Sequence, residues 1–150
     1  MDSTMKKVVI VDDNETDISV VRNMLKSLYE VIPAPSVIKL FTFMGNHIPD
    51  LVLLDIDMPA MNGFEAIKAM KEHSRYKDIP VVFLTGKNDD TSVLEGLNLG
   101  ATDYVTKPFS GPLLLQRISN ILLIEDLKKE LHESETALKD LRRQIANKGV

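Results

Sequence analysis

One short stretch most constrains the fold of this chain: four consecutive apolar residues at 51–54 end at the carboxylate of Asp55. An apolar run of this length is typical of a strand buried on both faces of a parallel sheet. Pro59 follows closely and cannot donate a ladder hydrogen bond, so we expect the strand to end near Asp55. Ligands of open parallel sheets bind just beyond the carboxyl ends of the strands. Asp55 is therefore the first candidate for a functional residue.

Strand-like and helix-like segments alternate along the rest of the chain. Apolar or β-branched runs that predict strands occupy residues 7–11, 30–34, 51–54, 79–84 and 103–106. Between them, apolar residues recur every three to four positions, which indicates helices with one buried face. In the first two predicted helices these residues are Ile18, Val21, Leu25 and Leu28, then Val37, Leu40, Phe41 and Met44.

Capping and turn residues mark where the predicted helices begin. Ser36, Asp89 and Ser110 stand just ahead of helical patterns, where a side-chain oxygen can accept a hydrogen bond from the first turn. Asn62 and Gly63 form a turn signal before the third helix. Five strand-helix repeats predict an α/β fold, a doubly wound parallel sheet with five helices on its two faces. A flavodoxin-like strand order of 2-1-3-4-5 fits this pattern best.

Composition excludes several classes of protein. The chain has 150 residues and a net charge of −4, so it fits one ordinary domain and does not favour direct nucleic-acid binding. It contains no cysteine, which excludes disulfides and thiolate metal sites. No apolar run is long enough to span a membrane, and the N-terminus lacks a signal peptide pattern. We therefore expect a soluble, cytoplasmic protein without membrane contact.

The last predicted helix continues past the end of a compact domain. Its apolar residues alternate three and four apart, with Ser134 as one interruption and charges of both signs around them. This spacing is typical of a coiled coil, which would make the chain a homodimer; a helix folded back on its own domain is the alternative. The predicted seam consists of Ile124, Leu127, Leu131, Leu138, Leu141 and Ile145. We accordingly divide the chain into a domain at 1–123, a coiled-coil extension at 124–146 and a frayed tail at 147–150.

Polar residues at the ends of four predicted strands meet at one edge of the sheet. Asp12 and Asp13 follow the first strand, Asp55 ends the third, Thr85 the fourth and Lys107 the fifth. Three carboxylates in one crevice repel each other unless some are protonated or a cation lies among them, and an all-oxygen ligand set suits Mg²⁺. A carboxylate beside a cation and a lysine can accept a phosphoryl group and form an aspartyl phosphate. Taken singly, each residue also has a structural interpretation: Asp12 and Asp13, for example, would cap the first helix.

The same residues carry a resemblance to a known family. From about residue 6 to 123, the chain resembles the receiver domain of two-component response regulators. The matching segments are Val11-Asp12-Asp13, Leu54-Asp55-Ile56-Asp57-Met58-Pro59 with Asn62-Gly63, Leu84-Thr85-Gly86, and Gly100-Ala101-Thr102-Asp103-Tyr104-Val105-Thr106-Lys107-Pro108-Phe109. They occur in the family's order and at plausible spacing, so the resemblance is specific.

The resemblance implies a phosphorylation-activated signalling switch. Asp55 would accept a phosphoryl group from a histidine kinase or a phosphotransfer protein, or from a small phosphodonor, and would lose it slowly. Asp12, Asp13, Asp55 and the backbone carbonyl of Asp57 would hold Mg²⁺. This chemistry would make the chain a phosphoprotein rather than an enzyme in the usual sense.

The resemblance also implies how the switch would respond. Lys107 would pair with the phosphoryl group, Thr85 would turn toward it, and Tyr104 would change rotamer to fill the vacated space. The bond before Pro108 would be a candidate for the cis form, which proline permits at a modest free-energy difference. The changed surface near the fourth and fifth strands would be read out together with the dimerising helix.

Three other interpretations follow from the same sequence. The Asp55-Ile56-Asp57 motif also resembles the opening motif of haloacid-dehalogenase-like phosphatases, although that family carries it on the first strand. A second alternative is an interaction module that dimerises without phosphorylation. Finally, the last helix would either join two receivers or connect the receiver to an effector domain missing from this chain.

Overall fold

The computed structural model describes residues 5–58, 63–86 and 90–148. Four short segments lie outside this description: 1–4, 59–62, 87–89 and 149–150. The predicted strand terminator Pro59, the turn residue Asn62 and the candidate cap Asp89 fall in these segments.

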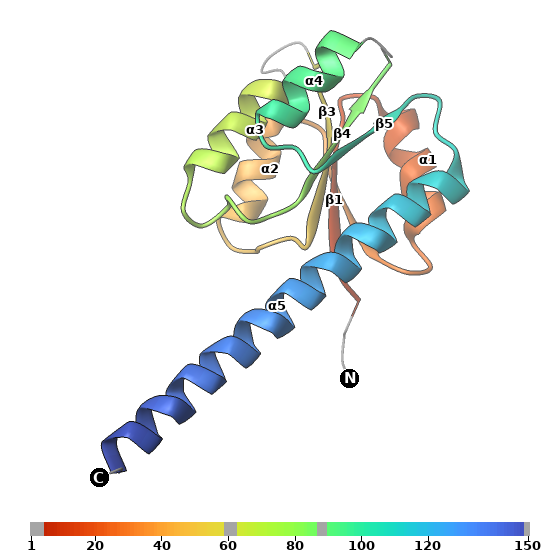
Figure 1. The fold of residues 1–150 in the computed structure, drawn as a ribbon. Helices are drawn as coiled ribbons and strands as arrows, with labels where there is room; N and C mark the ends of the chain where they lie inside the picture. Colours follow the sequence, from red (N-terminus) through yellow and green to blue (C-terminus); the bar gives the residue numbers. More distant parts are fainter. Residues whose placement is uncertain (1–4, 59–62, 87–89, 149–150) are drawn as a thin grey trace. The chain divides into compact units, whose positions relative to one another are not determined.

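Five strands and five helices alternate along the described chain (Figure 1). The strands form one sheet in the order β2-β1-β3-β4-β5, and every neighbouring pair is parallel. This order confirms the predicted flavodoxin-like fold. The elements are β1 (Lys7–Val11), α1 (Glu15–Leu25), β2 (Glu30–Ala34), α2 (Val37–Met44), β3 (Leu51–Asp55), α3 (Gly63–Glu72), β4 (Val81–Thr85), α4 (Asp90–Asn98), β5 (Asp103–Thr106) and α5 (Gly111–Lys148).

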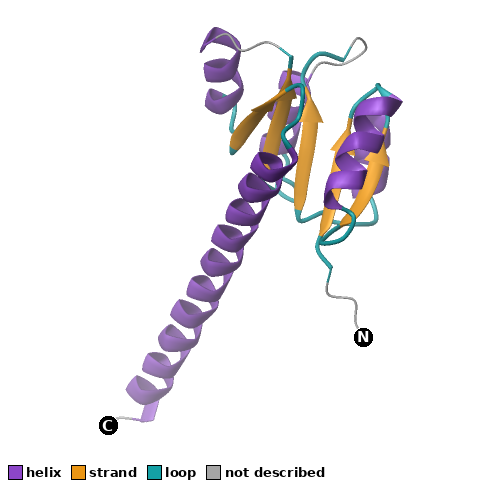
Figure 2. Ribbon diagram, turned by 90° about the vertical axis from the view of Figure 1, so that its right-hand side faces the viewer, coloured by secondary structure: helices purple, strands orange, loops and turns teal. Residues whose placement is uncertain are grey.

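The three central strands, β1, β3 and β4, are buried, as continuous apolar runs predict. Figure 2 shows helices in front of and behind the strands of the sheet. Helices α2 and α3 cover one face of the sheet and α1 lies on the other (Figure 1). Alternate strand residues such as Val9, Val52 and Val81 join the core beneath α2 and α3. Because all five strands run parallel, their carboxyl ends lie at the same edge of the sheet.

Helix α1 has a different N-terminal cap from the candidates Asp12 and Asp13. Asn14 is its N-terminal cap, and the Asn14 side chain accepts hydrogen bonds from the backbone N–H groups of Thr16 and Asp17. Asp12 and Asp13 are therefore not the caps of α1. The predicted apolar face is correct for Ile18, Val21 and Leu25 but wrong for Leu28, because the helix ends at Leu25 and Leu28 is exposed.

Helix α4 approaches the sheet through a glycine. A Cβ at Gly96 would lie 2.4 Å from the ring of Phe83, so only glycine allows this approach.

Ser36 caps α2 as predicted, because its hydroxyl accepts a hydrogen bond from the backbone N–H of Lys39.

Helix α5 spans 38 residues and continues through Lys148. Asn147 and Lys148, expected in a frayed tail, are therefore helical. Residue contacts divide the chain into two compact units, Met1–Gln116 and Arg117–Val150, with the boundary inside α5. The six apolar residues of the predicted seam are between 47% and 62% exposed. No helix in the described part of the chain has both the length and the apolar composition needed to cross a lipid bilayer.

Candidate functional site

The register of the central strands brings Asp12 and Asp55 together. Val11, the last residue of β1, pairs with Leu54 of β3, so the residues that follow them, Asp12 and Asp55, lie side by side at the carboxyl edge. Among the residues that the structure describes, three polar or charged residues are buried: Asp12, Asp55 and Thr85. All three stand at strand ends on this edge. Burying polar groups is costly unless they are paired, so their concentration at one place indicates a functional site.

A glycine stands where α3 begins, close to the end of β3. The backbone N–H of Gly63 donates a 3.4 Å hydrogen bond to the carbonyl of Ile56. A Cβ at Gly63 would lie 2.6 Å from the Cα of Ile56 and 2.8 Å from the carbonyl oxygen of Asp55. Only glycine therefore lets α3 begin this close to the end of β3.

Three carboxylates form an all-oxygen cluster at the centre of the site. One carboxylate oxygen from each of Asp12, Asp13 and Asp55 lies within 4.8 Å of the other two. Backbone N–H groups fix two of them: Asn14 donates to Asp12 Oδ1 at 3.0 Å, and Asp57 donates to Asp55 Oδ1 at 2.9 Å. Carboxylate oxygens at this spacing fit a hard cation such as Mg²⁺. The side chain of Asp57 is exposed.

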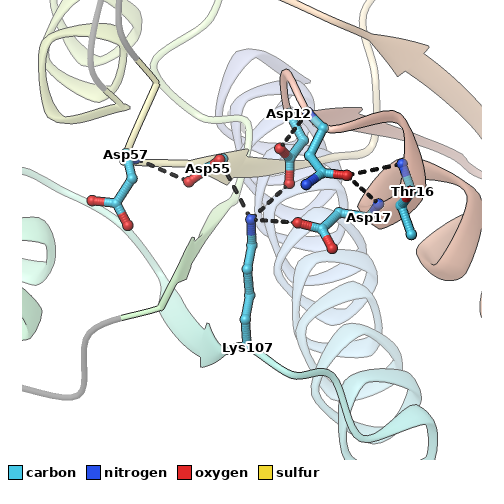
Figure 3. A network of polar contacts seen from close by, with 7 residues as sticks. Asp12, Thr16, Asp17, Asp55, Asp57 and Lys107 are labelled. Carbon is cyan, nitrogen blue, oxygen red and sulfur yellow. Dashed lines mark hydrogen bonds and ion pairs between the residues drawn. The ribbon is translucent and has the colours of Figure 1, made fainter.

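Lys107 supplies the positive charge of the site (Figure 3). Its Nζ lies 2.9 Å from Asp12 Oδ2 and 3.4 Å from Asp55 Oδ2. Its shortest contact, 2.8 Å, is with Oδ2 of Asp17 in the first turn of α1. The sequence patterns did not single out Asp17. The signal available in the sequence was an acid in the first turn of the helix that follows Asp12 and Asp13.

Burial and charge shift the pKa values of both central groups. Burial raises the pKa of Asp55 to about 6, and the charge of Asp12 raises it further. The hydrogen bond from the Asp57 backbone and the charge of Lys107 act in the opposite direction and lower this pKa. Burial lowers the pKa of Lys107, but its hydrogen bonds to Asp17 and Asp12 raise that pKa more, so it stands well above its usual value. The lysine is therefore a permanent cation.

The other predicted residues lie on β4 and β5. The Thr85 carbonyl accepts a 2.9 Å hydrogen bond from the backbone N–H of Lys107, which ties the ends of these strands together. Tyr104 is partly buried, and its ring stacks on Phe83 with 5.8 Å between centroids. The Lys107–Pro108 peptide bond is cis.

Comparison with known proteins identifies the class that this fold and this site define. The family model of the response regulator receiver domain matches residues 8–119. Because this match covers well over half of the chain, the chain belongs to the receiver domain family.

Individual relatives agree with this assignment. The chain is 40% identical over 111 residues to a probable cyclic di-GMP phosphodiesterase of Vibrio cholerae serotype O1, covering 74% of this chain and 25% of that protein. It is 35% identical over 130 residues to the response regulator SaeR of Staphylococcus aureus, covering 86% of this chain and 55% of that protein. A crystal structure of a putative response regulator from Chloroflexus aurantiacus superposes with a TM-score of 0.77 at 30% identity, covering 80% of this chain and 99% of that one.

The chain thus spans between a quarter and about half of these two curated relatives. Membership of the family supports a phosphorylation-dependent signalling switch.

Proposed function

We propose that Asp55 accepts a phosphoryl group from a phosphohistidine of a histidine kinase or phosphotransfer protein. The observation that carries this proposal is the buried Asp55 carboxylate with Lys107 Nζ 3.4 Å away. A carboxylate oxygen of Asp55 attacks phosphorus and forms an oxygen–phosphorus bond. The phosphorus–nitrogen bond breaks, and the imidazole leaves with the electron pair and takes up a proton. The ammonium of Lys107 offsets charge on the phosphoryl oxygens as the group is transferred.

Three carboxylates equip the site for a magnesium ion. Asp12, Asp13 and Asp55 would hold it, together with the backbone carbonyl of Asp57. A bound Mg²⁺ supplies positive charge to the phosphoryl oxygens. Asp13 is exposed while Asp12 and Asp55 are buried, so the site opens to solvent on the side of Asp13.

Phosphorylation would change the charge at the end of β3, and we expect Lys107 and Thr85 to respond to it. A phosphoryl group adds negative charge and acceptor oxygens at Asp55. Leu84 of β4 pairs with Asp55 of β3, and Thr85 directly follows Leu84. The Thr85 hydroxyl therefore belongs to the end of the strand next to Asp55. Thr85 and Phe83 both belong to β4, and the Phe83 ring stacks on Tyr104 of β5. Movement of Thr85 would therefore change the packing next to Tyr104. We propose that this surface of β4 and β5 is the read-out of the switch.

We further propose that α5 pairs with the α5 of a second copy. Six apolar residues at heptad spacing are about half exposed along this helix, and a contiguous exposed apolar stripe is typical of an interaction surface. A parallel, in-register pair places each seam residue against its own copy. That arrangement buries all six apolar positions and opposes Ser134 to Ser134. An effector domain beyond this chain would then receive the signal through the paired helices.

The intact mass after incubation with Mg²⁺ and acetyl phosphate tests the phosphorylation step. We expect the parent chain to gain one phosphoryl group and Asp55→Asn to gain none. Chelation of the metal should abolish the gain. No gain in the parent under any condition would support the interaction module that works without phosphorylation. Continuous turnover of a generic phosphate ester would support the phosphatase alternative.

A further inference from the structure

Lys107 is held mainly from the α1 side of the site. The ammonium has three hydrogens, and three carboxylates surround it. Its distances to Asp17 and Asp12 are 2.8 Å and 2.9 Å, while the distance to Asp55 is 3.4 Å. Figure 3 shows Asp17 reaching the Nζ of Lys107 from α1, beside Asp12. The lysine therefore makes its weakest contact with the residue that we propose as phosphoacceptor.

Asp17 differs from the other acids in what it can do at the site. Asp12 and Asp55 belong to the cluster that fits Mg²⁺, whereas Asp17 lies outside that cluster, and its carboxylate pairs with Lys107 (Figure 3). Its side chain is 27% exposed, so solvent screens the contact only in part. Its charge acts on Lys107 before any phosphoryl group arrives.

We propose that Asp17 is a positioning residue that holds Lys107 toward α1 in the unphosphorylated chain. This inference rests on the proposed function, because it concerns the lysine that pairs with the phosphoryl group. A phosphoryl group at Asp55 must attract the ammonium in competition with Asp17. The Asp17 carboxylate also repels the incoming negative charge. Both effects have the same sign: Asp17 favours the unphosphorylated state.

Removing the charge of Asp17 should therefore strengthen binding of a phosphoryl mimic. Beryllofluoride, which occupies a carboxylate as a phosphoryl group does, can be titrated at saturating Mg²⁺ and followed by fluorine NMR. Asp17→Asn should tighten its binding by roughly three- to tenfold, the effect of one partly screened ion pair. Asp17→Glu keeps the charge and should bind nearly as the parent does.

Glu15→Gln is the matched control. Glu15 is a second acid in the first turn of α1, so this variant loses the same charge from the same turn. We expect less than a twofold change. Saturating Mg²⁺ is established separately for each variant from the rise in its melting temperature.

The sign of the change separates positioning from support of the fold. If Asp17 only supported the fold, Asp17→Asn would bind beryllofluoride more weakly than the parent, and that result would overturn the inference. A change in affinity equal to that of Glu15→Gln would overturn it as well. If the parent binds no beryllofluoride and gains no phosphoryl mass, the proposed function itself fails and the inference with it. If the parent does both, a negative result concerns Asp17 alone.

Discussion

The Nζ of Lys107 lies 2.8 Å from Asp17 Oδ2 and 3.4 Å from Asp55 Oδ2. The one ammonium of the described site is thus shared with an acid on α1. Asp12 also contacts this ammonium, and Asp13 belongs to the same carboxylate cluster, so the site holds four carboxylates and this one described cation. When all four are ionised, the site carries a net charge of −3, which attracts a divalent cation.

Magnesium should stabilise the folded chain. At a free concentration ten times the dissociation constant, binding adds about 1.4 kcal/mol to the free energy of unfolding. Asp13→Asn should remove most of this gain and have little effect without metal, because Asp13 is exposed. Melting curves with and without Mg²⁺ measure both effects, and Glu15→Gln serves as control. An equal gain in Asp13→Asn would argue against the proposed ligand set.

Asp55→Asn should stabilise the metal-free chain at neutral pH. The folded-state pKa of Asp55, about 6, lies above its ordinary value of 3.8, so the folded state binds this proton more tightly than the unfolded chain does. The ionised carboxylate therefore lowers stability as pH rises from about 4 to 6. The gain in Asp55→Asn should reach at most about 3 kcal/mol above pH 6 and vanish near pH 4.

Urea unfolding in a chelator, repeated across this pH range, measures the gain for Asp55→Asn. The control is Asp78→Asn, which should show no such profile. Asp78 is exposed and precedes the N-terminal end of β4, the end opposite to the site. A gain that is constant between pH 4 and 7 would contradict the predicted ionisation of Asp55.

Gly63→Ala should destabilise the domain by about 2–3 kcal/mol, because its methyl group would collide with the backbone at the end of β3. Gly86→Ala is the matched substitution. A Cβ at Gly86 meets no described atom within 4 Å, so its effect should stay within about 0.5 kcal/mol. Chemical denaturation of the two variants tests this difference. Equal stability of both would show that α3 can shift away from β3 at little cost.

Ser134→Cys should form a disulfide-linked dimer under mild oxidation. In a parallel, in-register pair of α5 helices, this position faces its own copy at a distance that a disulfide can span. Thr136→Cys, two residues further on and on the outer face of the helix, should not. The chain contains no other cysteine, so non-reducing electrophoresis reads the result directly. Equal cross-linking of both variants, or a monomer by sedimentation, would contradict the proposed pairing.

Most of the fold could be predicted from local sequence. The ranges of β1, β2 and β5 coincide with the apolar runs seen in the sequence, and strict alternation with helices left few sheet orders. Leu28 was assigned wrongly to α1 because helical periodicity alone does not show where a helix ends. Asn14 was missed as a cap because Asp12 and Asp13, equally good capping residues, precede it.

The sequence by itself determined which groups gather at the carboxyl edge, because each of Asp12, Asp55, Thr85 and Lys107 directly ends or follows an apolar strand. Their order along the chain, with the parallel sheet, places them together. Only the tertiary structure decided which partners Lys107 has. Asp17 comes from a helix, and its distance to Lys107 depends on how α1 packs on the sheet. The register of β1 on β3 and the packing of α1 are set by burial of side chains far apart in the sequence, which no local pattern records.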